Sequence, residues 1–130
     1  MSTELTMLAW AIVLGLVHIS IAAVLSVAGR GLSWAAGPRD GTPPPVGPLA
    51  ARMARASANF METFAFFAAA VLAVIVAGKS SETTMLGAQI YFWARVAYIP
   101  AYAVAVPFLR TLVWAVSLAG LVMVLIGLFN

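Results

Sequence analysis

Four polar side chains with reactive or ligand-binding groups interrupt an otherwise apolar stretch of the chain. Arg52, Arg55, Asn59 and Glu62 follow one another at steps of three, four and three residues. On a helix with about 100° per residue they lie within an arc of roughly 80°, over about 15 Å of length. Guanidinium groups bind carboxylates in bidentate fashion, and a carboxylate binds an ammonium group or holds an arginine in place. This stripe therefore predicts a site for an anionic polar ligand.

A second polar face follows in the next apolar segment. Tyr91, Arg95, Tyr98 and Tyr102 are spaced by four, three and four residues, which places them on one side of a helix. Pro100 lies inside this segment and is expected to kink it, because proline cannot donate the helical hydrogen bond. Tyrosines near a helix end also form interfacial belts in membrane proteins. Such a belt needs no arginine, so Arg95 favours a polar site.

Arg110 opens the last apolar segment, and by itself it is typical of an arginine that snorkels to the membrane surface.

Counting the basic residues on each side predicts the orientation of the chain in the membrane. Lys79 stands on the side with both termini, whereas the other side holds Arg30, Arg39, Arg52, Arg55 and Arg110. By the positive-inside rule the arginine side is cytosolic and both termini lie outside. The two polar stripes and Arg110 are then expected to meet at the same membrane face.

These residues need helices to position them, and the composition indicates membrane-spanning helices. The chain has 130 residues, of which 64% are hydrophobic and 8% are charged, so it cannot cover a soluble surface. We predict an all-α integral membrane protein with one domain, 1–130, embedded in a lipid bilayer. At about 20 residues per span, the apolar segments predict a bundle of four transmembrane helices at about 5–28, 49–77, 84–106 and 108–129.

Several other kinds of chemistry find no support in the sequence. The net charge of +3 is spread over helix ends, so nucleic acid is not an expected partner. There is no cysteine, and the single histidine and the scattered carboxylates have no metal-ligand spacing. His18 is expected to hydrogen-bond to a neighbouring helix rather than to bind a ligand. A nucleophilic thiol, if one is used, must come from a ligand.

The only long loop is expected at 31–48, where PRDGTPPPVGP combines turn signals with three consecutive prolines. The prolines also resemble a polyproline recognition segment, but without a longer proline-rich context a stiff connector is the better interpretation. Arg39 and Asp40 are adjacent at its centre and are close enough to pair.

Two segments resemble the MAPEG family, the membrane-associated proteins of eicosanoid and glutathione metabolism. RASANFMETFAFF, from Arg55 to Phe67, is similar to the family signature R-A-x-x-N-x-x-E-x-x-x-F. ARVAYIPAYAVAVPFLRTLVW, from Ala94 to Trp114, resembles the family's third helix and the arginine that opens its fourth. The resemblance covers essentially the whole chain, and the loop with its Arg-Asp pair is similar to the bacterial branch.

This resemblance implies a homotrimer in the bacterial inner membrane that binds glutathione between subunits near the cytosolic face. Arg55, Asn59 and Glu62 match positions that contact the tripeptide in the family. Tyr98 and Tyr102 match tyrosines that line the same site.

Three arginines complete the site that the resemblance implies. Arg110 resembles the arginine credited with stabilising the glutathione thiolate, so it and Tyr102 are the expected catalytic residues. Arg52 and Arg95 match family arginines and are expected at the glutathione site, with no metal required; for Arg52 a structural role is the alternative, and Arg95 is expected to support the site rather than take part in the chemistry.

The implied function is a glutathione-dependent membrane transferase or peroxidase, working on a hydrophobic substrate that arrives from the bilayer. One alternative is a non-catalytic scaffold of the same fold that binds a lipid or an anion. A third interpretation is an unrelated bundle in which the arginines and Glu62 pair only to stabilise the fold. Under that interpretation Arg55→Ala would weaken the assembly without changing any ligand affinity.

Overall fold

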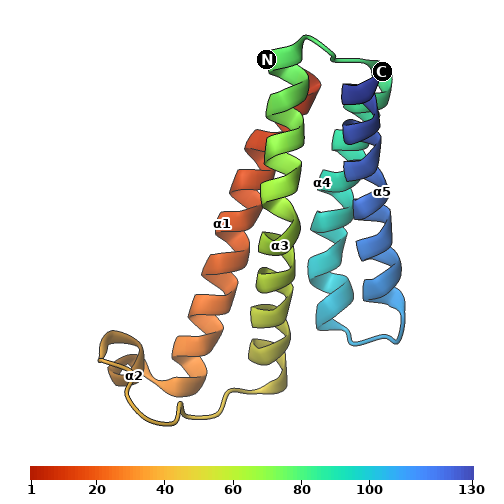
Figure 1. Ribbon diagram of the computed structural model, residues 1–130. Helices are drawn as coiled ribbons and strands as arrows, with labels where there is room; N and C mark the ends of the chain where they lie inside the picture. Colours follow the sequence, from red (N-terminus) through yellow and green to blue (C-terminus); the bar gives the residue numbers. More distant parts are fainter.

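A computed structural model describes residues 1–130 as helices joined by short connections, without strands. The helices are α1 (Thr3–Arg30), α2 (Leu32–Ala36), α3 (Pro48–Ala77), α4 (Glu82–Ala103) and α5 (Leu109–Phe129). The four long helices run up and down in an antiparallel bundle, and the short α2 stands outside it (Figure 1). The predicted all-α bundle is confirmed.

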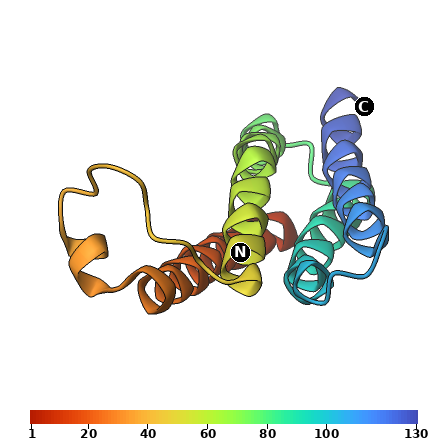
Figure 2. The same cartoon turned by 90° about the horizontal axis from the view of Figure 1, so that it is seen from below.

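Three of the helices, α1, α3 and α5, are long and apolar enough to cross a membrane. The fourth, α4, has 22 residues and so reaches about 33 Å, slightly more than a hydrocarbon core of about 30 Å. It lies beside α5 in both views of the bundle and packs against it more closely than any other pair does (Figures 1 and 2). If α5 spans the bilayer, α4 spans it too. The expectation of an integral membrane protein is confirmed.

The helix ends follow from local sequence signals. Ser2 caps α1, and Ser81 and Thr84 form a reciprocal capping box at the start of α4. Pro48 occupies the first turn of α3, where its missing N–H costs nothing. Gly78 closes α3 in the left-handed conformation at φ 66°, which glycine adopts without steric penalty.

One predicted boundary is wrong: α4 was expected to reach Val106, but it ends at Ala103. Val106 precedes Pro107, and a residue before proline is disfavoured in helical conformation. The chain therefore turns over residues 104–108 before α5 begins at Leu109. In addition, the helix at 32–36 lies inside the segment that the sequence predicted as loop.

Small residues let α4 and α5 approach one another closely. A Cβ atom at Gly120 would lie 2.6 Å from the carbonyl oxygen of Gly87, so the two backbones are in direct contact. Near the centre of the bundle Phe67 of α3 stacks on Tyr91 of α4, with 4.0 Å between ring centroids. The hydroxyl of this tyrosine shares a hydrogen bond of 2.9 Å with Thr63. These contacts fix α4 between α3 and α5.

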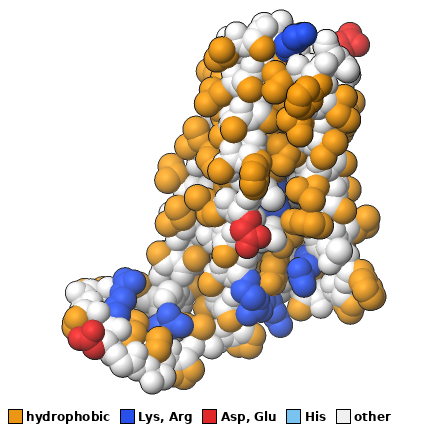
Figure 3. All heavy atoms as spheres, in the orientation of Figure 1, with side chains coloured by type: hydrophobic (Ala, Val, Ile, Leu, Met, Phe, Trp, Pro, Cys, Tyr) orange, Lys and Arg blue, Asp and Glu red, His pale blue; other side chains and the backbone are white.

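The two ends of the bundle differ in charge. Both termini lie at one end, and the loop after α1 and the turn between α4 and α5 lie at the other (Figure 1). Most of the Lys and Arg side chains gather at the end without termini (Figure 3). The structure thus confirms that the helices bring the predicted arginines to one end. Which side of a membrane this end faces remains a prediction.

Candidate functional site

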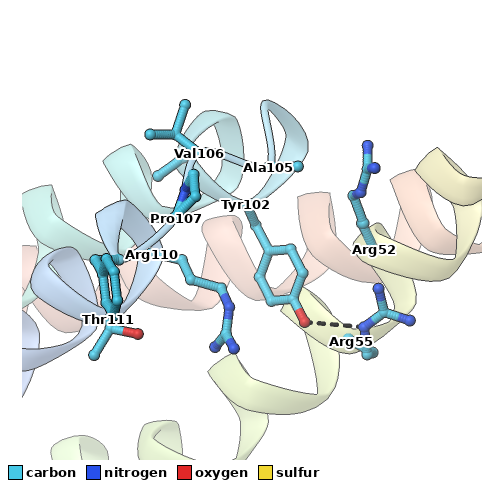
Figure 4. A pocket seen from close by; sticks show the side chains of 10 residues that line it. Arg52, Arg55, Tyr102, Ala105, Val106, Pro107, Arg110 and Thr111 are labelled. Carbon is cyan, nitrogen blue, oxygen red and sulfur yellow. Dashed lines mark hydrogen bonds between the residues drawn. The ribbon is translucent and has the colours of Figure 1, made fainter.

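An open pocket of about 460 Å³ lies at the arginine-rich end, between the start of α3, the end of α4 and the start of α5. Figure 4 shows its lining side chains. They are Arg52, Arg55, Ala101, Tyr102, Ala105, Val106, Pro107, Phe108, Arg110 and Thr111. Four of the residues singled out in the sequence therefore meet in one place: Arg52, Arg55, Tyr102 and Arg110. No carboxylate lines this pocket, so its field is strongly positive.

Tyr102 stands between the arginines of α3 and the arginine of α5 (Figure 4). Arg55 donates a hydrogen bond of 3.0 Å from Nε to the Tyr102 hydroxyl oxygen. The Arg110 guanidinium carbon lies 5.2 Å from the centroid of the same ring, which is the range of cation–π attraction. Because the hydroxyl accepts from Arg55, its own proton remains free to donate to a ligand.

Arg52 has a partly structural role, because it also bonds to the end of α4. Its Nη1 donates a hydrogen bond of 3.3 Å to the carbonyl oxygen of Ala103, the last residue of α4. Helix C-termini leave carbonyl groups without intrahelical partners and carry partial negative charge, so an arginine is well suited there. Arg52 thereby joins α3 to the end of α4, while its remaining N–H groups stay available at the pocket.

The turn that forms one wall of the pocket is strained. Ala105 and Phe108 adopt positive φ values of 56° and 66°, a conformation that residues with a Cβ atom rarely take. Each such residue costs on the order of 1 kcal/mol, and strain of this kind concentrates at functional sites. Both residues line the pocket. The backbone strain at these two positions therefore favours a binding role for this wall of the pocket.

Behind the pocket lies a buried polar layer. Arg95 is fully buried and donates a hydrogen bond of 2.9 Å from Nη1 to the side-chain oxygen of Asn59. Its guanidinium carbon lies 4.2 Å from the centroid of the Tyr98 ring. Tyr98 in turn contacts Tyr102 edge to face, at 5.6 Å between centroids. Asn59, Arg95 and Tyr98 therefore support Tyr102 from behind, and none of them lines the pocket.

Two other predicted residues lie elsewhere. Glu62 is exposed on α3, outside the pocket and about half-way along the helix. His18 is buried and stacks on Phe60 of α3 at 5.0 Å between centroids, while its Nε2 has no hydrogen-bond partner. The expected hydrogen bond from His18 to a neighbouring helix is absent at this nitrogen, and the histidine contacts α3 through its ring face instead.

Sequence reasoning missed the turn residues of the pocket. The predicted helices at 84–106 and 108–129 include Ala105, Val106 and Phe108 and leave only Pro107 between them. The Val-Pro pair was the available signal, because it disfavours helix at Val106. Nothing in the sequence predicts a left-handed conformation at Ala105 or Phe108. Alanine and phenylalanine rarely adopt positive φ, and they do so only where tertiary contacts impose it.

The fold and the site together describe a multi-pass helical membrane protein with a cationic pocket at one end of its bundle. Residues 7–130 match the MAPEG family, and the chain therefore belongs to this family. Membership places it among the membrane proteins of glutathione and eicosanoid metabolism, which include glutathione transferases and peroxidases. A search among curated proteins gives no match.

Proposed function

We propose that this protein is a glutathione-dependent membrane transferase or peroxidase. The observation that carries the proposal is the grouping of Arg52, Arg55 and Arg110 around Tyr102 in one open pocket without a carboxylate. Glutathione is an anion at neutral pH with two carboxylates, one ammonium group and one thiol. A pocket lined by several guanidinium groups matches the carboxylates, and it also favours ionisation of the thiol.

Each pocket residue has a distinct proposed role. Arg52 and Arg55, on one side of Tyr102, bind the carboxylates of the tripeptide through their remaining N–H groups. Arg110, on the other side of the ring, stabilises the thiolate. The Tyr102 hydroxyl, whose oxygen accepts from Arg55, donates its proton to the same sulfur. These two residues are the proposed catalytic groups.

The required change in acidity is modest. A free thiol has a pKa of about 8.5, so only a few per cent is thiolate at neutral pH. A shift of one pKa unit corresponds to about 1.4 kcal/mol of preference for the charged form. One nearby guanidinium and one hydroxyl donor supply effects of this size. The enzyme then acts mainly by positioning and ionising a nucleophile that the ligand brings.

The second substrate is proposed to reach the thiolate from the bilayer. In the transferase reaction the sulfur forms a bond to an electrophilic carbon and a leaving group departs with the bonding electrons. In the peroxidase reaction the thiolate attacks a hydroperoxide oxygen, which yields an alcohol and a sulfenic acid. A second glutathione converts this sulfenic acid into a disulfide and water. Val106 and Phe108 form an exposed apolar rim at which a lipid-soluble molecule can enter.

The remaining predicted residues act in the second layer or at a subunit boundary. Arg95, Asn59 and Tyr98 hold Tyr102 in place. Glu62 is exposed on α3 and has no hydrogen-bond partner within the chain, although a carboxylate half-way along a membrane helix is costly to leave facing lipid. A homotrimer, with glutathione bound between subunits at the cytosolic face, would cover Glu62 and make its carboxylate available to the ligand's ammonium group.

The test is an ultraviolet difference spectrum of the detergent-purified protein titrated with glutathione at neutral pH. Bound thiolate absorbs at about 240 nm, so a saturable band reports a lowered thiol pKa. We expect this band in the wild type and its loss in Arg110→Ala, with glutathione still bound. Binding without a band would favour the non-catalytic scaffold, and no binding would overturn the glutathione assignment.

A further inference from the structure

A second basic pocket, of about 400 Å³, lies beside the bundle rather than within it. The last two turns of α1, the short α2 and the loop after it enclose this pocket, and Arg30, Trp34 and Arg39 line it. Figure 2 shows α2 and the loop standing to one side of the bundle, next to the end of α1. None of the residues around this pocket belongs to the proposed glutathione site.

Backbone carbonyl groups hold both arginines in place. Arg30 donates from Nε to the carbonyl oxygen of Pro44 at 2.9 Å. Arg39 donates from Nε and Nη2 to the carbonyl oxygen of Ala35, at 3.2 and 2.9 Å. These bonds leave both Nη atoms of Arg30 and Nη1 of Arg39 without a partner. Asp40, which the sequence predicted as a partner of Arg39, makes no ion pair with it, so the positive charge is not neutralised.

The backbone conformation of the loop also fixes the positions of Arg30 and Arg39. Arg39 adopts a positive φ of 59°, which lets its side chain fold back on α2 at the cost of backbone strain. Val46 packs against Gly29, where an added Cβ atom would lie 3.3 Å from the valine side chain. The two guanidinium groups are therefore positioned before any ligand arrives.

An apolar stripe leads from the membrane interior to this pocket. Ile12, Leu16, Ile19 and Ala23 follow one another on α1 at steps of four, three and four, and Arg30 continues the same face two turns later. The three larger side chains are about half exposed, at 50%, 60% and 51%. Beside α3 they form an apolar groove that includes Phe64. From Ile12 to Ala23 the helix rises about 17 Å, which accommodates most of an extended acyl chain.

We propose that this face of α1 binds an anionic phospholipid. The phosphate sits between Arg30 and Arg39, Trp34 lies at the headgroup level, and one acyl chain runs along the stripe from Ala23 to Ile12. Trp is favoured at this depth of a bilayer, and basic pockets at helix ends recognise anionic headgroups. Each basic residue near an anionic headgroup contributes about fivefold in affinity, so two arginines contribute about 25-fold.

Native mass spectrometry of the full chain, released from nanodiscs of phosphatidylcholine with increasing phosphatidylglycerol, tests this proposal. We expect one saturable phosphatidylglycerol adduct per chain in the wild type. In the double variant Arg30→Gln, Arg39→Gln its half-saturating fraction should rise by about 25-fold or the adduct should disappear. Ala23→Trp, which fills the pocket from α1 without changing charge, should also weaken it, and this variant keeps the proposal testable if the double variant folds poorly.

The matched control removes the same charge at the same end: Arg52→Gln, Arg55→Gln. It should keep the phosphatidylglycerol adduct while it loses glutathione binding. Equal loss of the adduct in both double variants would mean diffuse attraction to basic residues and would overturn the proposal. Displacement of the lipid by millimolar inorganic phosphate would overturn it as well, because the site would then recognise a free anion rather than a lipid. Failure of the glutathione titration alone leaves the lipid result unaffected.

Discussion

The two ends of the bundle use charge in opposite ways. At the end with the termini, Glu4 is fully buried and its Oε2 accepts hydrogen bonds from Ser80 and Thr84, the latter at 2.7 Å. Lys79 nearby donates to the backbone oxygen of Asn130 at 3.2 Å. At the other end, Arg55 and Arg110 converge on an open pocket and bond to no carboxylate. At the end with the termini, charged groups join helices; at the other end Arg52 also joins α3 to α4, but Arg52, Arg55 and Arg110 keep N–H groups available to a ligand.

This contrast separates two kinds of polar residue in a membrane bundle. A buried carboxylate such as Glu4 needs hydrogen-bond donors, because an unpaired buried charge costs several kcal/mol. Ser80 and Thr84 supply two donors to its Oε2, whereas Oε1 has no partner. An arginine at a water-filled pocket pays no such cost while the pocket is open. Polar groups bonded between helices in the interior therefore indicate structure, whereas arginines held at an open pocket with free N–H groups indicate binding.

Loss of Arg110 is expected to have the largest effect on turnover at the arginine-rich end. In Arg110→Ala we expect turnover with a chromogenic electrophile to fall by about 100-fold, as when one donor to a developing or stabilised anion is removed. The glutathione dissociation constant should change by only a few fold, because Arg52 and Arg55 remain. The control is Lys79→Ala at the opposite end, which should retain full turnover. A variant with normal turnover would rule out the proposed role of Arg110.

Loss of the Thr84 hydroxyl is expected to destabilise the end of the bundle that holds the termini. Thr84→Val keeps the size of the side chain but removes one donor to the buried Glu4 carboxylate and the acceptor of the Ser81 N–H in the capping box, which together cost about 1.5–3 kcal/mol or more. We expect a lower midpoint of thermal unfolding in detergent and an unchanged affinity for glutathione in the protein that remains folded. Thr83→Val, at an exposed neighbouring position, is the matched control. Equal stability of the two variants would contradict the assignment of Glu4 to structure.

Tyr102→Phe sharpens the comparison because it removes one atom from the pocket. The ring stays in place between the arginines, but Arg55 loses its acceptor, and the proposed glutathione thiolate would lose a hydroxyl donor. We expect the thiolate band to titrate at a higher pH, by about one unit, with unfolding nearly unaffected. The measurement is a pH series of difference spectra at saturating glutathione. Tyr91→Phe, whose hydroxyl contacts Thr63 in the core, should leave that pH unchanged.

Ala105→Gly addresses the smallest effect, the strain in the pocket wall. Glycine adopts positive φ freely, so we expect the folded state to gain about 0.5–1 kcal/mol, measured as a higher unfolding midpoint. If the strained turn shapes the pocket, the same change should weaken glutathione binding about twofold to threefold. Ala115→Gly, at an exposed position inside α5, should instead lower stability. A loss of stability in Ala105→Gly would show that the turn is not strained.

Helical spacing was enough to predict the pocket residues that lie near helix ends. The step of three residues from Arg52 to Arg55, together with the antiparallel order of the helices, placed them beside Tyr102 and Arg110, as observed. Spacing specifies the face of one helix, but it does not specify what that face meets. Asn59 shares the stripe of Arg55, yet Arg95 from α4 occupies its oxygen.

The opposite end was harder to predict. Glu4 and Thr84 are 80 residues apart in the chain, and neither belongs to a periodic polar pattern. Their contact depends on the relative height of α1 and α4, which only packing determines. The short helix at 32–36 and the early end of α4 are similar cases, because local conformational preferences and tertiary contacts together determine these helix boundaries.

The direct backbone contact between Gly87 and Gly120 has a consequence for biogenesis. Of the four long helices, α4 alone falls short of the apolarity that marks a membrane span, because Arg95, its tyrosines and Gln89 interrupt it. A segment of this kind partitions poorly into lipid by itself. From its close fit to the strongly apolar α5 we expect the two helices to enter the bilayer as one hairpin. A bulkier residue at Gly120 would therefore impair membrane insertion of α4, and with it the delivery of Tyr102 to its place among the arginines.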